Sequence, residues 1–127
     1  MHIDNRKIRV ADIKKKYMNN IIDAAKKCNL IDKVILFGSS IETRCKESSD
    51  IDIAVFGNQI RSKALASKKY ERFARQLFAY NDFDQDYDIL YFKSGTPINS
   101  LIMDDIQKGE VLYQAGKLKV DMISISL

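Results

Sequence analysis

The spacing of apolar residues along the chain predicts an alternation of helices and short strands. At the N-terminal end, apolar residues recur every three or four positions, which predicts an amphipathic helix over residues 5–29. The residues of its apolar face are Val10, Ile13, Tyr17, Ile21, Ala24 and Cys28. The same spacing predicts a second helix over residues 62–80, with Ser62 as its N-cap.

Short apolar runs bounded by polar residues or glycine predict buried strands. These runs cover residues 33–37, 51–56 and 86–92. The remaining expected elements are a short helical stretch from about Ser40, a helix over 98–108 that ends at Gly109, and a short strand over 111–114. This order indicates α/β or α+β packing around a small sheet. The tail, residues 117–127, is compatible with another strand or with a loose end.

Composition narrows the class of protein. The chain has 127 residues, of which 46% are hydrophobic and 30% charged, and this balance is typical of one soluble globular domain over residues 1–127. It contains no apolar run of about 18 residues that would cross a membrane. Its start, Met1 to Lys7, lacks the apolar stretch of a signal peptide. We therefore expect a cytoplasmic protein that does not contact a membrane.

The reactive side chains exclude several mechanisms. His2 is the only histidine, so a Ser-His-Asp triad, a Cys-His pair and a histidine-rich metal site are not expected. Cys28 and Cys45 lack metal-ligand spacing, and we expect both to be free thiols.

The net charge is +4, and the basic residues are concentrated near the N-terminus. They are Arg6, Lys7, Arg9, Lys14, Lys15 and Lys16. They can be interpreted as a basic face for nucleic acid or an acidic protein, or as a solvated helix face. We favour the solvated face and do not expect a nucleic-acid partner. A positive balance also suits an enzyme with a polyphosphate substrate.

The most informative stretch runs from Leu36 to Phe56. A predicted strand ends at Gly38-Ser39, where glycine would let the backbone approach a ligand and a helix start would offer N–H groups to a phosphate. An ordinary turn is the alternative interpretation. Asp50 and Asp52 open the next strand, and their spacing of two places both carboxylates on one face.

Two neighbouring carboxylates repel each other, and a divalent cation removes that cost. Magnesium prefers such oxygen ligands and often also binds substrate phosphates, whereas a solvated strand end is the alternative interpretation. Asp88 opens another apolar strand, and it would bring a third carboxylate if that strand pairs beside the first. Three carboxylates can hold the two metal ions of nucleotidyl transfer. Asp82, Asp84 and Asp86 compete with Asp88 for this role.

The pattern of Gly-Ser, Asp-x-Asp and a later Asp before aliphatic residues resembles the DNA polymerase beta-type nucleotidyltransferases, and in size the chain resembles their minimal bacterial members. The resemblance runs from about Val34 to Tyr113. It implies an α+β fold with a small mixed sheet packed against helices. It also implies that Gly38 and Ser39 bind the nucleotide phosphates, and that Asp50, Asp52 and Asp88 hold two Mg²⁺ ions.

The resemblance further implies a donor and an acceptor. Minimal members are often encoded beside a helical HEPN-type toxin, and several act as antitoxins that transfer AMP from ATP to a hydroxyl of that partner, most often a tyrosine. Such a protein, or a second copy in a homodimer, is therefore the expected partner. Antibiotic nucleotidylation and a catalytically lapsed binding module remain as alternatives. The chain departs from the family where Ala-Arg-Gly is usual, because Ile41, Glu42 and Thr43 stand there and only Arg44 could replace the arginine.

Overall fold

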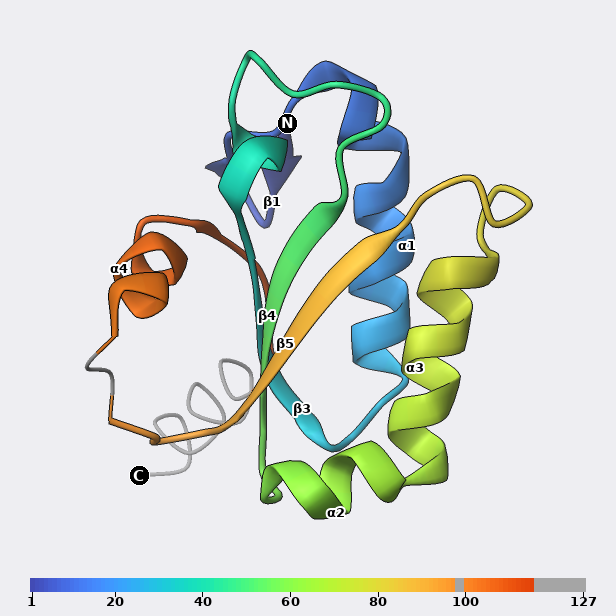
Figure 1. The fold of residues 1–127 in the computed structure, drawn as a ribbon, viewed down its shortest axis with the longest axis vertical. Coiled ribbons are helices and arrows are strands. Elements are labelled where there is room, and N and C mark those ends of the chain that lie inside the picture. Colours follow the sequence, from blue (N-terminus) through green and yellow to red (C-terminus); the bar gives the residue numbers. More distant parts are fainter. Residues whose placement is uncertain (98–99, 116–127) are drawn as a thin grey trace.

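A computed structural model of the chain describes residues 1–97 and 100–115. Its centre is a four-stranded mixed sheet in the order β5-β4-β3-β6 (Figure 1). The strands are β3 (Ile31–Phe37), β4 (Ile51–Gly57), β5 (Tyr87–Lys93) and β6 (Glu110–Gln114). β3 runs antiparallel to β4 and β6, whereas β4 and β5 are parallel. The fold is therefore α+β with a small mixed sheet, as expected.

Each face of the sheet has its own apolar core. The long helices α1 (Lys15–Lys26) and α3 (Lys68–Ala79) cover one face, and α4 (Leu101–Gln107) lies on the other (Figure 1). The larger core packs α1 and α3 against alternate strand residues, which include Val34, Leu36, Ile51, Ile53, Val55 and Tyr91. The smaller core packs α4 against Ile35, Phe37, Ala54 and Phe56. Because side chains of a strand alternate between faces, the apolar residues of one strand are divided between the two cores.

The prediction of one helix over residues 5–29 was wrong for its first ten residues. The chain instead begins with a hairpin of β1 (His2–Ile3) and β2 (Arg6–Lys7). The single 3₁₀ turn η1 (Asp12–Lys14) then precedes α1. Asp4 and Asn5 form the two-residue hairpin loop and have φ angles of 50° and 66°. Aspartate and asparagine tolerate this left-handed conformation, and a two-residue loop with two positive φ angles matches the twist of the paired strands.

The predicted helix over residues 62–80 is two helices, α2 (Arg61–Ala66) and α3, and the predicted N-cap Ser62 lies inside α2. Ser67 separates the helices, because its backbone is extended and its Oγ accepts a hydrogen bond from the N–H of Lys69. This is the usual role of serine at an N-cap. The periodic apolar positions continue across the break, and the sequence pattern therefore concealed it.

The other expected elements are present with shifted ends. The strand predicted from Lys33 starts at Ile31, and the helix predicted over 98–108 is α4. Residues 98–99 and the tail over 117–127 lie outside the described residues. Cys28 and Cys45 are both free, as expected. In the part of the chain that the structure describes, no helix combines the length and apolar character needed to cross a membrane.

Candidate active site at the strand ends

Sheet topology brings the three predicted aspartates to one end of the sheet. Asp50 directly precedes β4, and Asp52 is the second residue of that strand. β5 runs parallel to β4, and the register pairs Asp52 with Asp88. Since parallel strands begin at the same edge, the third carboxylate arrives beside the first two.

The three carboxylates also share a face of the sheet. The odd-numbered neighbours Ile51 and Ile53 are fully buried in the core under α1 and α3. Ala54, two residues after Asp52, belongs to the core under α4. Asp52 therefore projects on the α4 side, and residue pairing places Asp88 on the same side. The predicted separation of aspartates from isoleucines is confirmed.

Asp52 is the member of this group with the most perturbed ionisation. Burial, followed by the charges of Asp88 and Asp50, raises the pKa of Asp52 from 3.8 to about 6. Burial acts because low dielectric disfavours the charged carboxylate, and the neighbouring charges act by repulsion. Ser39 and Asp52 are half-buried, whereas Asp50 and Asp88 are exposed. The site therefore carries an uncompensated negative charge.

Gly38 has a role beside Asp52 that the sequence did not reveal. Phe37 pairs with Asp52, so the next residue of the chain lies against the Asp52 side chain. A Cβ atom on Gly38 would lie 2.3 Å from Oδ2 of Asp52, and the φ angle of Gly38 is +72°. Only glycine fits this position, because a side chain would collide with the carboxylate and the backbone is left-handed.

The helix expected after Gly38-Ser39 is a single 3₁₀ turn, η2 (Gly38–Ile41). A single turn aligns fewer N–H groups than the helix start that was expected to offer them to a phosphate. Ser39 is half-buried, while Ser40 is fully buried and accepts a backbone hydrogen bond from Ala11 at 2.7 Å. The glycine and the neighbouring carboxylates, not a helix end, define this part of the site.

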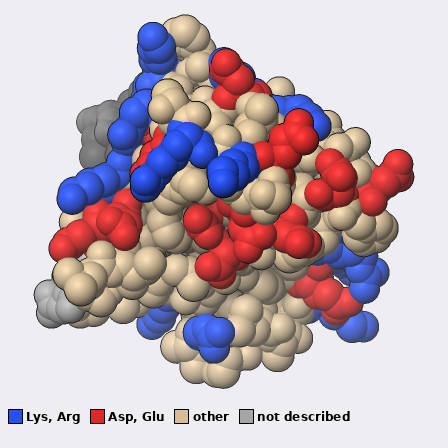
Figure 2. All heavy atoms as spheres, turned by 45° about the horizontal axis from the view of Figure 1, so that its top comes forward, with Lys and Arg blue, Asp and Glu red and all other residues tan. Residues whose placement is uncertain are grey.

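Figure 2 shows the end of the molecule where β4 and β5 begin. Acidic side chains form a continuous group at its centre, with lysine and arginine side chains along one side. Within residues 1–97 and 100–115, no three acidic, histidine or cysteine side chains already lie in the arrangement of a metal site. The charges of Asp88 and Asp50 disfavour the ionised form of Asp52, and a bound divalent cation would offset this repulsion. Three hard oxygen ligands with excess negative charge fit Mg²⁺ by their chemistry.

The competing aspartates are placed differently. Asp84 accepts a hydrogen bond from the hydroxyl of Tyr17 at 3.3 Å, in the loop before β5. Asp82 is exposed at a left-handed position of the same loop. Asp86 precedes β5 and uses its backbone oxygen to accept from the N–H of Ile51 at 3.0 Å. None of the three contributes to the raised pKa of Asp52, which depends on Asp88 and Asp50.

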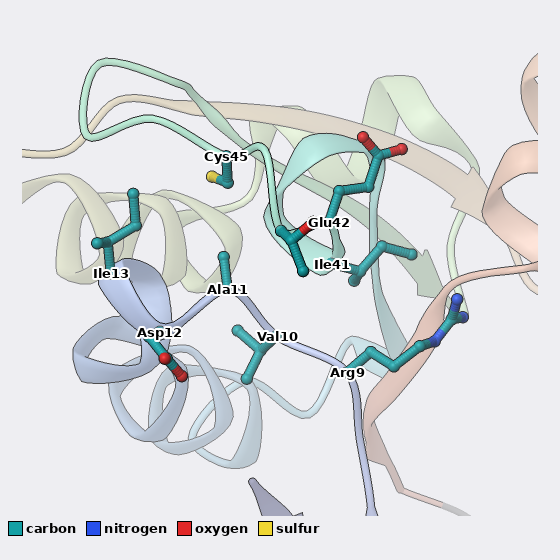
Figure 3. A pocket seen from close by; sticks show the side chains of 9 residues that line it. Arg9, Val10, Ala11, Asp12, Ile13, Ile41, Glu42 and Cys45 are labelled. Carbon is teal, nitrogen blue, oxygen red and sulfur yellow. The ribbon is translucent and has the colours of Figure 1, made fainter.

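A pocket of about 490 Å³ lies next to η2 but does not contain the carboxylates. Its lining comes from residues 9–13 on one side and from Ile41, Glu42, Thr43 and Cys45 on the other (Figure 3). Glu42 forms an ion pair with Arg44, the residue considered as a replacement for the missing arginine. The three predicted site aspartates, Asp50, Asp52 and Asp88, do not line this pocket.

The structure corrects the expectation of a solvated basic surface at one position. Lys14 is only 1% exposed, and its Nζ donates three hydrogen bonds inside the protein. Gln85, which was not singled out from the sequence, is 4% exposed and accepts one of them. A buried lysine with internal acceptors is rare, and neither its spacing nor its neighbours in sequence indicated it. The other members of the N-terminal basic group, Arg6, Lys7, Arg9, Lys15 and Lys16, are exposed, as expected.

Comparison with known protein families identifies the family of the chain. A family model described as "Polymerase beta, Nucleotidyltransferase" matches residues 19–118, which is most of the chain and includes all five predicted site residues. No curated protein sequence matches the chain.

Proposed function

Since the chain belongs to the polymerase beta nucleotidyltransferase family, we propose that it transfers AMP from ATP to a hydroxyl group of a partner protein. Nucleotidyl transfer follows from the family. The observation that supports the catalytic residues is the in-register pairing of Asp52 with Asp88 on the face that also carries Asp50.

The proposed chemistry is displacement at the α-phosphorus of ATP. The acceptor oxygen forms a new bond to phosphorus, the bond to the pyrophosphate oxygen breaks, and pyrophosphate leaves. When bound, two Mg²⁺ ions would neutralise the phosphate charges and make the acceptor hydroxyl more acidic. Asp50 and Asp52 would hold both ions, and Asp88 would complete one site and receive the hydroxyl proton. Gly38 and Ser39, which lie beside Asp52 at the end of β3, would bind the β- and γ-phosphates.

A protein acceptor fits the surface near the site better than a small sugar does. α4 packs on the same face of the sheet as the carboxylates, and it exposes Leu101 and Ile102 by 87% and 43%. These two adjacent apolar side chains would be covered by an acceptor protein that docks on α4, and this is the surface on which the proposal of a protein acceptor rests. We therefore propose a helical protein of the HEPN toxin type, modified on tyrosine, as the acceptor. An antitoxin role of this chain follows from that proposal.

The Glu42–Arg44 ion pair supports a second candidate. A phosphate contact by Arg44 would have to compete with Glu42, and a chain without that contact could retain partner binding after losing transfer. A catalytically lapsed binding module is therefore the alternative.

Position-specific labelling of ATP tests these functions. The chain is incubated with Mg²⁺, lysate and ATP labelled on either the α- or the γ-phosphorus. We expect label on protein only from α-labelled ATP, and none with EDTA or with Asp52→Asn. Label from γ-labelled ATP would indicate a kinase, and α-label in small molecules would indicate an antibiotic-type acceptor. No transfer, with Mg-ATP binding retained, would support the lapsed module.

A further inference from the structure

Lys14 is a buried cation outside the family match, which begins at residue 19. An ammonium group has three N–H donors. Here they reach the carbonyl oxygens of Glu47 and Ser49 at 3.0 and 2.7 Å and Oε1 of Gln85 at 2.6 Å. All three acceptors are uncharged. Burying a lysine costs free energy, and full hydrogen bonding by three acceptors offsets it.

Gln85 connects Lys14 to the segments that directly precede β4 and β5, the two strands that carry the aspartates. Its Nε2 donates to the carbonyl oxygen of Ser49 at 3.0 Å and to that of Asp86 at 2.6 Å. Ser49 directly precedes Asp50, and Asp86 lies two residues before Asp88. We call Lys14, Gln85 and the carbonyl oxygens that they bind the Lys14 clamp.

The same N-terminal segment also reaches the third part of the site. The N–H of Ala11 donates to the carbonyl oxygen of Ser40 in η2 at 2.7 Å. Residues 11–14 therefore contact η2, which holds Gly38, the loop before β4, which holds Asp50, and the loop before β5, which leads into Asp88. The sheet fixes Asp52 and Asp88 through strand pairing. Asp50 precedes the first paired residue of β4, so strand pairing does not fix it. Its position depends instead on the loop whose carbonyl oxygens bind Lys14.

We propose that Lys14 is a positioning residue for nucleotidyl transfer, acting through the clamp to fix Asp50 relative to Asp88. This inference rests on the proposed function, because the aspartates matter only if they hold metal-bound nucleotide. Lys14 itself touches neither substrate nor metal in this role. Loss of the clamp should disturb the binding of metal-bound ATP and leave the binding of metal-free ATP unchanged.

The test compares Lys14→Met, which removes the donors at similar volume, with Lys26→Met, an exposed position on α1. Calorimetry on the full chain measures the affinity for ATP with Mg²⁺ and for ATP with EDTA. We expect Lys14→Met to weaken Mg-ATP binding by roughly tenfold or more, the scale seen for groups that support metal ligands. Metal-free ATP affinity should not change, and Lys26→Met should match the wild-type chain in both titrations.

The outcomes separate the clamp from the proposed function. The wild-type chain and a folded Lys14→Met variant could show the same ratio of Mg-ATP affinity to metal-free ATP affinity. That result would overturn the positioning role of Lys14 but not the proposed function. A wild-type chain without any magnesium preference would overturn the proposed function and the clamp with it. Lys14→Gln, which keeps an N–H donor, replaces Lys14→Met if circular dichroism shows that the latter is unfolded. Failure of both variants to fold would assign Lys14 to stability and overturn its positioning role.

Discussion

Gly38 shows how one residue can be required for two reasons. Gly38→Ala should abolish transfer, since its Cβ would lie 2.3 Å from Oδ2 of Asp52 and displace that carboxylate. A misplaced catalytic group commonly costs about 100-fold in rate. Gly95→Ala is the matched control, because Gly95 also has a left-handed φ, of +85°, but no described atom within 4 Å of an added Cβ. Similar transfer rates for the two variants would contradict the collision with Asp52.

Asp52→Asn should stabilise the metal-free chain near neutral pH. Burial, then Asp88 and Asp50, raise the pKa of Asp52 from 3.8 to about 6, so the folded chain binds this proton more tightly than the unfolded chain. The wild-type free energy of unfolding should therefore fall as pH rises between these two values. The variant should lack this fall and gain about 1 kcal/mol at pH 7, allowing for solvent screening. Urea unfolding in EDTA at several pH values measures the free energy of unfolding of the wild-type chain and of the variant. Identical pH dependence in the two chains would disprove the prediction.

Asp88 and Asp86 provide a matched pair for assigning the third carboxylate. Asp88→Asn should lower the transfer rate by about 100-fold or more while retaining much of the Mg-ATP binding, because Asp50 and Asp52 remain. Asp86→Asn should retain the wild-type rate, since the structure uses the backbone oxygen of Asp86 and not its side chain. Transfer assays and calorimetry on both variants check this. A larger loss of rate in Asp86→Asn would move the role to Asp86.

Single residues were predictable where a simple periodicity governed them. The strand period of two was sufficient to separate Asp50 and Asp52 from Ile51. The burial of Lys14 was not predictable, because lysine is normally solvated and its three acceptors come from residues 33 to 71 positions away. The closeness of Gly38 to Asp52 likewise depends on strand pairing and has no local signal.

At the scale of elements, the break between α2 and α3 depends on one cap. Ser67→Ala removes the acceptor for the N–H of Lys69 and should lower the free energy of unfolding by about 1 kcal/mol. Ser62→Ala, inside α2, should have a smaller effect because alanine has the higher helix propensity. Denaturant unfolding of both variants provides the comparison. An equal or greater loss for Ser62→Ala would contradict the assignment of the cap.

The strands were more predictable than the helices. Apolar runs identified β3, β4 and β5, because the polar residues of these strands lie near the strand ends and leave the middle of each strand apolar. The N-terminal hairpin was missed, because Val10 and Ile13 continue the helical spacing of α1 by coincidence. Ile13 is in fact 37% exposed. A turn of two residues, Asp4 and Asn5, leaves too short a signal to compete with that spacing.

At the scale of the whole molecule, the pairing of β4 with β5 was the decisive unknown. From the sequence, Asp88 was expected beside Asp50 and Asp52 only if the two strands are neighbours. Tertiary packing decides which strands pair, and the sequence pattern carries no signal for it. The structure makes them parallel neighbours and places β6 at the far edge, beside β3. Both faces of the sheet are then covered by helices, which is the usual environment of parallel strands.

Nucleotide binding should stabilise the whole fold in a metal-dependent way. Mg-ATP at about 100 times its Kd should raise the free energy of unfolding by roughly 2.7 kcal/mol, because only the folded chain holds the carboxylates together. Thermal unfolding monitored by circular dichroism, with Mg-ATP and with ATP plus EDTA, measures this. Equal melting temperatures in the two conditions would count against a metal-bound nucleotide.

The parallel pairing of β4 and β5 also determines when the site is completed during synthesis. β3 and β4 can pair soon after Gly57 leaves the ribosome, since only residues 38–50 separate them. Asp88 joins later, after the whole crossover through α2 and α3 has been made. A nascent chain therefore carries two of the three carboxylates before the third has been made. The proposed metal site is completed only when β5 pairs with β4.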